Sequence, residues 1–86
     1  MTEILTKELY KLEDAFPNGM NQTEYRMVIT LLYEDYSDRN LSDLLSTFTK
    51  KSEAEVYNDI LGINEYCFKN EDLFPMICKL KEFGLI

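Results

Sequence analysis

The side chains that most often carry out chemistry in proteins are scarce in this 86-residue chain. Histidine is absent, which removes the commonest general base and the commonest transition-metal ligand. Cys67 and Cys78, the only cysteines, make no zinc site without histidine, and we expect two half-buried thiols on apolar helices in preference to a disulfide. Three glycines, at positions 19, 62 and 84, are too few and too far apart for a phosphate-binding loop or a dinucleotide fingerprint.

The acidic side chains also lack a catalytic spacing. The visible acid pairs, at residues 13–14, 34–35 and 71–72, are adjacent in sequence, and adjacent residues of a helix do not face each other. The regular acidic spacing of a calcium-binding loop does not occur. The sequence therefore predicts no catalytic residue, no metal site and no cofactor, and we expect the protein not to be an enzyme.

Tyrosines and neighbouring acids indicate a protein-binding surface instead. The chain has six tyrosines, and tyrosine is common at interfaces because it combines a large apolar ring with a hydroxyl that still forms hydrogen bonds. Tyr33, Tyr57 and Tyr66 lie at or beyond the margins of the apolar faces of their predicted helices. The residues expected to contact a partner are Tyr33, Glu34, Asp35, Asp38, Glu55, Tyr57, Asp59 and Tyr66.

The charge of the chain restricts the class of partner. Sixteen acidic and nine basic side chains give a formal net charge of −7. Nucleic-acid binding relies on Lys and Arg that neutralise phosphates, so we expect a basic protein partner and no nucleic acid. No apolar run approaches the roughly 18 residues of a membrane span, and the acidic N-terminus is unlike a signal peptide. We expect a cytoplasmic protein that does not enter a membrane.

These surface residues must be positioned by helices, because apolar residues recur throughout at spacings of three and four. Thr2 is expected to cap a first helix that ends near Ala15, before a turn at residues 16–19. The second helix should begin at Asn21, through a capping box with Glu24, and end near Asp35. Apolar residues occur on more than one side of this second helix, so we place it at the centre of the fold.

Three further helices follow in the prediction. Ser37 starts a third helix, and Tyr36 is expected to pack against Leu41 as a hydrophobic staple. Ser52 starts a fourth helix that should reach about Tyr66.

Gly62 on the fourth helix should let another backbone or a bulky side chain come close, most simply from the first or second helix of the same protein. The last helix begins near Asn70, unless Pro75 moves its start to about Asp72 or kinks it, and Gly84 ends it. A chain of this length holds one core. We therefore expect residues 1–86 to form a single all-α domain of about five short helices.

The landmarks of these helices resemble a small helical family known as domain of unknown function 3349. Its Tyr-Pro-x-Gly turn followed by an Asp-Tyr is similar to the turn at residues 16–20, which reads FPNGM, followed by Glu24-Tyr25. Its closing helix, with Asp-Val or Asp-Leu and a terminal Leu-x-x-x-Gly, is similar to Asp72-Leu73 and to Leu80 with Gly84. The chain departs from the family in Pro75 and in its more acidic surface. The resemblance covers residues 16–84 and implies a compact helical domain without a known activity.

Size and charge also resemble, in general character only, the immunity proteins with which bacteria neutralise their own nuclease toxins. We therefore expect an immunity protein that covers the substrate cleft of a basic toxin domain. The alternative is a regulatory or scaffold domain that binds another protein or itself, through Met27, Leu31 and the region of Gly62. A helix-turn-helix that binds nucleic acid is disfavoured, because acids at positions 35, 38 and 43 surround the would-be recognition helix.

Overall fold

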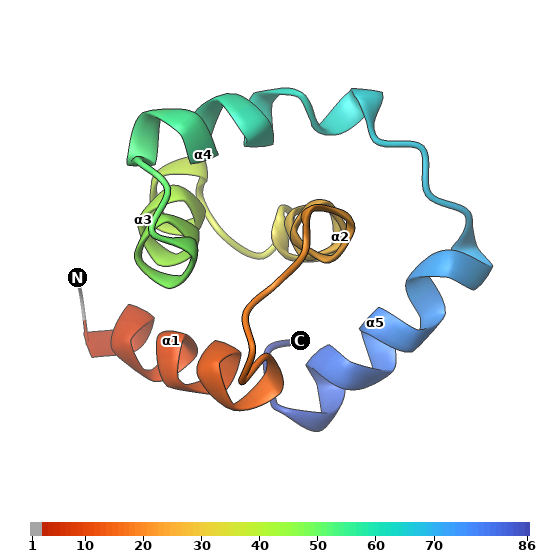
Figure 1. Cartoon of the computed structure of the whole chain (residues 1–86), viewed down its shortest axis with the longest axis horizontal. Coiled ribbons are helices and arrows are strands. Elements are labelled where there is room, and N and C mark those ends of the chain that lie inside the picture. The colour runs from red at the N-terminus through yellow and green to blue at the C-terminus, as the bar shows by residue number, and fades with distance from the viewer. Residues whose placement is uncertain (1–2) are drawn as a thin grey trace.

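Five α-helices and one short 3₁₀ helix make up the fold of this computed structural model, which describes the backbone of residues 3–86 and the side chains of residues 5–86. Figure 1 shows α2 nearly end-on in the middle, with the other helices arranged around it. All regular structure within the described range is helical, as the sequence predicts. The elements are α1 (Glu3–Ala15), α2 (Gln22–Leu32), α3 (Asp38–Thr49), α4 (Glu53–Leu61), the 3₁₀ helix η1 (Ile63–Glu65) and α5 (Asn70–Glu82).

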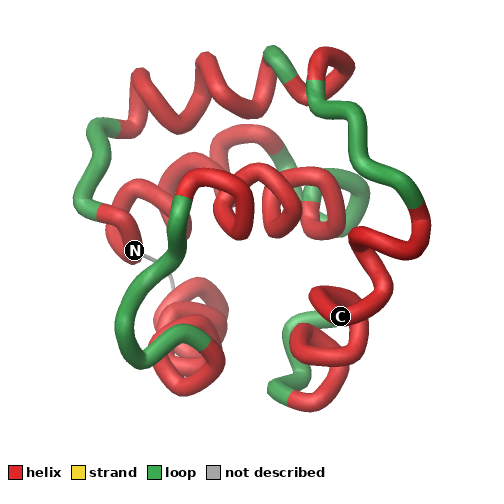
Figure 2. The backbone as a smooth tube through the Cα atoms, turned by 45° about the vertical axis from the view of Figure 1, so that its right-hand side comes forward, coloured by secondary structure: helices red, strands yellow, loops and turns green. Residues whose placement is uncertain are grey.

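The central position of α2 is confirmed by its burial. Tyr25, Val28, Ile29 and Leu32 repeat at spacings of three and four and are at most 1% exposed. Met27, on another side of the helix, is half-buried and also packs against the core. Helix α2 packs on α5, while α3 packs on both α1 and α4, so the surrounding helices enclose α2 and supply the rest of the core. The tube in Figure 2 shows the loops that connect these helices along the outside of the molecule.

Local capping begins the helices where the sequence indicates. The Asn21 side chain accepts from the Glu24 N–H at 2.8 Å, and the Glu24 carboxylate accepts from the Asn21 N–H at 3.0 Å, which completes the predicted capping box. Ser37 caps α3 and Ser52 caps α4 through their side-chain oxygens. Thr2, the predicted cap of α1, lies outside the described residues.

Helices α2 and α4 are shorter than predicted. Helix α2 ends at Leu32 because the next residues turn tightly, with the Asp35 N–H donating to the Leu32 carbonyl at 3.0 Å. Helix α4 ends at Leu61 instead of Tyr66, since Gly62 weakens the helix and the Tyr66 hydroxyl donates back to the Asp59 carbonyl at 2.6 Å.

The structure also corrects the expectations for the two cysteines and, in part, for Gly62. Cys67 leaves the core and is exposed, and Cys78 is exposed on α5, so neither free thiol is half-buried as predicted. A Cβ atom at Gly62 would meet the Asp59 carbonyl at 3.6 Å and the Tyr66 hydroxyl at 4.0 Å, which are ordinary contacts within the same stretch of chain. The bulky side chain that approaches Gly62 is therefore that of Tyr66, and the expected approach of the first or second helix was wrong.

The observed ends of α5 agree more closely with the ends that the sequence predicts. The helix begins at Asn70 and contains Pro75, and the Asp72 carboxylate accepts from the Lys69 N–H at 3.1 Å. At the other end Gly84 has φ +75°, the Gly84 N–H donates to the Lys81 carbonyl and the Leu85 N–H to the Leu80 carbonyl. These are the two hydrogen bonds of a Schellman motif, and they return Leu85 to the core.

Candidate functional site

The corner between α2 and α3 carries the most exposed group of the predicted partner-binding residues. Tyr33 is 41% exposed, and Glu34 and Asp35 are exposed beside it. The structure records no hydrogen bond or ion pair for the side chains of these three residues. Asp38, in the first turn of α3, is half-buried. We call residues Tyr33, Glu34, Asp35 and Asp38 the acidic corner.

The acidic corner is held by contacts of the two residues that directly follow Asp35. Ser37 accepts from the Asn40 N–H at 3.1 Å and so fixes the start of α3. The Tyr36 hydroxyl donates to the Glu8 carboxylate of α1 at 3.0 Å, across 28 residues of sequence. Burial, this hydrogen bond and the negative charges of Glu8 and Asp35 raise the pKa of Tyr36 above its ordinary value. The turn is therefore a fixed corner between two helices, anchored to a third.

A groove of about 550 Å³ opens next to the acidic corner. Leu5 and Leu85 give it apolar walls, while Glu8, Asp35 and Asn40 give it polar ones. Lys11 already pairs with Glu8 at 3.0 Å and donates to the Gly84 carbonyl at 3.2 Å. The Asp35 side chain, in contrast to that of Glu8, has no recorded hydrogen bond or ion pair.

Asp59, in contrast, is held inside a hydrogen-bonded network near the start of α2. Its carboxylate accepts from the Tyr25 hydroxyl at 2.7 Å and lies 3.5 Å from the Lys51 ammonium. The same ammonium lies 4.3 Å from the centre of the Tyr25 ring. Burial, followed by the hydrogen bond to Asp59, raises the pKa of Tyr25 above its ordinary value. Asp59 therefore stabilises the packing of α4 on α2.

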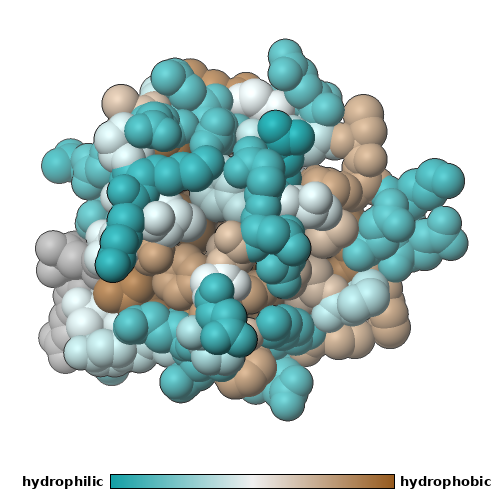
Figure 3. Space-filling view, viewed as in Figure 1, coloured by the Kyte–Doolittle hydropathy of each residue, from teal (hydrophilic) through white to brown (hydrophobic). Residues whose placement is uncertain are grey.

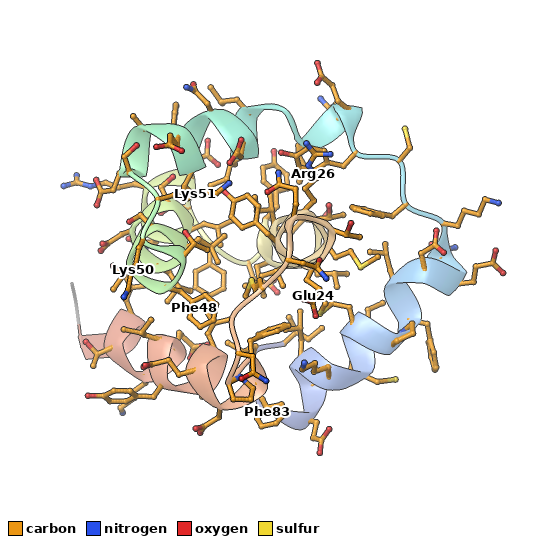
Figure 4. The ribbon with its side chains drawn as sticks, in the orientation of Figure 1. Glu24, Arg26, Phe48, Lys50, Lys51 and Phe83 are labelled. Atoms are coloured by element: carbon orange, nitrogen blue, oxygen red, sulfur yellow. The ribbon has the colours of Figure 1, made fainter. Side chains whose placement is uncertain are left out.

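Tyr66 belongs to the same network. Its hydroxyl donates to the Asp59 carbonyl, and the Arg26 guanidinium lies 5.1 Å from the centre of its ring. Burial raises the pKa of Tyr66, with a contribution from the Asp59 charge. In Figure 4 Arg26 is seen above α2, to which it belongs, and Lys51 to the upper left of that helix. The contacts of Tyr66 with its own chain hold the segment after α4 in place.

Tyr57 and Glu55 lie apart from this network. Tyr57 is 44% exposed and lines a hollow of about 300 Å³ with Arg39 and Ser42 of α3. Residues 57 and 59 are 200° apart on a helix, so Tyr57 faces the side of α3 while Asp59 faces α2. Glu55 is exposed in the first turn of α4, where its N–H and carboxylate both bond to Ser52.

The eight predicted residues thus form three groups instead of one surface. Tyr33, Glu34, Asp35 and Asp38 lie together at the end of α2, while Asp59 and Tyr66 belong to the network at its start. Tyr57 and Glu55 occupy other flanks of α4. Sequence reasoning missed Tyr25, Arg26 and Lys51 as partners in the Asp59 network, because Tyr25 and Asp59 are 34 residues apart and no local spacing connects them.

Among the described residues, no three His, Cys, Asp or Glu side chains come together in a way that would hold a metal ion. Each of the helices there is too short or too polar to cross a membrane.

Comparisons with known proteins give no further assignment. No family model matches the chain, and neither a curated protein nor a solved structure matches it significantly. The resemblances to the 3349 family and to immunity proteins therefore stay predictions.

Proposed function

We propose that this chain is a small acidic protein-binding domain of the immunity type, which neutralises a basic nuclease-type toxin by covering its substrate cleft. The acidic corner would make the contact. One observation supports it above the others: Tyr33, Glu34 and Asp35 are exposed together, without an internal partner, on a turn that three helices hold in place.

The charge of the acidic corner suits a cleft that normally binds a polyanion. Such a cleft is lined by Lys and Arg, and Glu34 and Asp35 would meet these side chains in place of phosphates. Long-range attraction between a chain of net charge −7 and a basic domain speeds their encounter and is screened by salt.

Tyr33 would supply most of the short-range affinity. Its ring is already partly exposed, so a partner can bury it without rearranging the core. The bond between Tyr36 and Glu8 keeps the turn in one shape before binding, which lowers the entropic cost of association. Asp59 and Tyr66 would act indirectly, by stabilising the fold, while Glu55 and Tyr57 would contact only a partner that also reaches α4.

The test begins with the gene directly upstream, which we expect to encode a basic toxin domain. That domain, inactivated and immobilised, is titrated with this protein at low and high salt. We expect a stoichiometric complex whose association slows as salt rises. Reversing two charges at the corner, with Glu34→Lys and Asp35→Lys, should slow association about tenfold. Tyr33→Ala should speed dissociation about thirtyfold, the effect of an interface anchor worth about 2 kcal/mol.

The matched control reverses two exposed acids on α5, with Glu71→Lys and Glu82→Lys, and makes the same change in net charge. Equal slowing by both double variants would show that net charge alone steers the encounter, and the acidic corner would lose its assignment. An association rate that does not depend on the salt concentration would contradict the electrostatic part of the proposal.

A self-associating regulatory or scaffold domain is the second candidate. Met27 and Leu31, its predicted contacts, pack against the core, which leaves less of them for a partner. Tyr57 and Leu61, four residues apart on α4, are 44% and 57% exposed and offer an alternative apolar contact. Sedimentation at micromolar concentration separates the candidates: a dimer that Leu61→Glu dissociates favours this one, and a clean monomer excludes it.

A further inference from the structure

The groove of about 550 Å³ beside the acidic corner brings three distant parts of the chain together. Helix α1, the turn between α2 and α3, and the segment after α5 each contribute to its lining. Its floor is closed, because Leu5 and Leu85 are only 2% and 5% exposed. Asp35 and Ile86, in contrast, are exposed. The groove therefore offers a partner one carboxylate and one apolar side chain that are both accessible.

The groove is acidic, like the molecule as a whole. Among the described residues that line it, Glu8 and Asp35 are charged, and none is a lysine or an arginine. Lys11 balances Glu8 at 3.0 Å, whereas the Asp35 side chain has no recorded hydrogen bond or ion pair. Arg39, the cation nearest to this turn in sequence, lines the hollow beside Tyr57 instead. The charge that is left for a partner is therefore that of Asp35.

The Tyr36 hydroxyl lies in the field of both carboxylates. It donates to Glu8 at 3.0 Å, and Tyr36 lines the groove together with Asp35. Burial and this hydrogen bond raise the pKa of Tyr36 most, and the charges of Glu8 and Asp35 raise it further. A cation that enters the groove is attracted by the same charges. An apolar side chain would instead remove water from Asp35 without giving it a partner, which is costly.

The hollows at the start of α2 differ in that their charges are matched. Figure 3 shows this face, where hydrophilic residues lie over and between apolar ones. Two hollows there, of about 420 and 220 Å³, share Gly19 and Phe48. Lys51 at their rim is balanced by Asp59 at 3.5 Å, and Phe16 beneath them is 3% exposed. A charged side chain of a partner would gain less there than beside Asp35.

We propose, on the basis of the function proposed above, that the groove beside the acidic corner receives one lysine or arginine side chain of the basic partner. The aliphatic stem would lie against Ile86, and the charged end would meet Asp35. Lysine and arginine suit such a groove because their stems pack on apolar surface while their charged ends stay at its polar edge. Asp35 would then slow dissociation, whereas Glu34, which lies outside the lining, would act only on the encounter.

The first test uses three short peptides, acetyl-Gly-X-Gly-amide, in which X is lysine, arginine or glutamine. Each peptide is titrated into the isotope-labelled 86-residue chain at constant ionic strength, and the amide NMR shifts are followed. The lysine and arginine peptides should give saturable shifts at Asn40 and Ile86, with millimolar dissociation constants, and the glutamine peptide should not. The basic peptide that binds more tightly identifies the side chain that the groove prefers.

Two variants of neighbouring acids locate the contact. Asp35→Asn should weaken the binding of both basic peptides about two- to fivefold, which is the effect of a partly exposed ion pair. Glu34→Gln removes the same charge one residue away, outside the lining of the groove, and should leave the affinity unchanged. Equal weakening by both variants, or equal shifts with the glutamine peptide, would overturn the proposal.

The second test measures rates in the complex with the inactivated toxin domain. Asp35→Asn should speed dissociation about fivefold, while Glu34→Gln should change only the association rate. Equal dissociation rates of the two variants would overturn the proposal for the groove and leave the proposed function standing. A toxin domain that does not bind at all would overturn the proposed function instead, and the peptide shifts would still assign the groove to a basic side chain.

Discussion

The two ends of α2 carry the same residue types and use them differently. At the start of the helix Tyr25 is buried, and its hydroxyl bonds to Asp59, whose charge is balanced by Lys51. At the other end Tyr33 is partly exposed, and Asp35 has no recorded partner. A tyrosine and an aspartate thus hold two helices together at one end of α2, and form a candidate binding surface at the other end. What separates the two is whether another helix covers the pair.

The largest expected contrast comes from truncating the two tyrosines. Tyr25→Ala removes a fully buried ring and should lower the free energy of unfolding by about 3–5 kcal/mol. Tyr33→Ala removes a ring that is already partly in water and should cost less than about 1 kcal/mol. Urea denaturation of both variants measures the difference. Similar losses would mean that the exposed end of α2 is also part of the core.

A smaller contrast is expected for the two aspartates. Asp59→Asn weakens the hydrogen bond from Tyr25 and the ion pair with Lys51, and should cost about 1–2 kcal/mol. Asp35→Asn should stay within about 0.5 kcal/mol of the wild type. The same denaturation experiment compares them, with a double-mutant cycle between Asp59→Asn and Tyr25→Phe as the check. A coupling energy of zero in that cycle would show that the hydrogen bond between Tyr25 and Asp59 does not contribute to stability.

The dependence of stability on pH should sharpen the comparison further. The pKa values of Tyr25 and Tyr36 are raised in the folded protein, so above about pH 10 the unfolded chain loses protons that the folded one keeps. The free energy of unfolding should therefore fall as pH rises beyond that point, and be fully retained below it. Tyr25→Phe and Tyr36→Phe should each make this fall less steep, whereas Tyr33→Phe serves as the exposed control. Unchanged slopes in the first two variants would contradict the assignment.

Much of the fold was predictable because its determinants are local. Asn21, Ser37 and Ser52 begin helices through contacts with residues three positions on, and such spacings are visible in a sequence. The burial of Val28, Ile29 and Leu32 follows from the same periodicity. The predicted ends of α2 and α4 lie beyond the observed ones. A tight turn after Leu32 ends α2, and α4 ends before the segment in which the Tyr66 hydroxyl donates to the Asp59 carbonyl, although the apolar pattern continues in both cases.

The candidate site was predictable only in part. Tyr33, Glu34 and Asp35 were placed together correctly because they are neighbours in the chain. Tyr57 and Asp59 were grouped by proximity in sequence, although their side chains leave α4 in different directions. The two hollows that share Gly19 and Phe48 were not predicted, since their lining residues come from separate segments of the chain.

By itself, the sequence determined an all-helical chain with a central second helix, capped helix starts and a strongly acidic charge. These properties depend on composition and on contacts within one helical turn. Only the tertiary structure decided which acidic side chains form hydrogen bonds within the protein. Asp59 meets Tyr25 across 34 residues and Glu8 meets Tyr36 across 28, and such partners are chosen by how the helices pack. The same packing leaves Glu34 and Asp35 exposed and separates them from the lysines at the other end of α2.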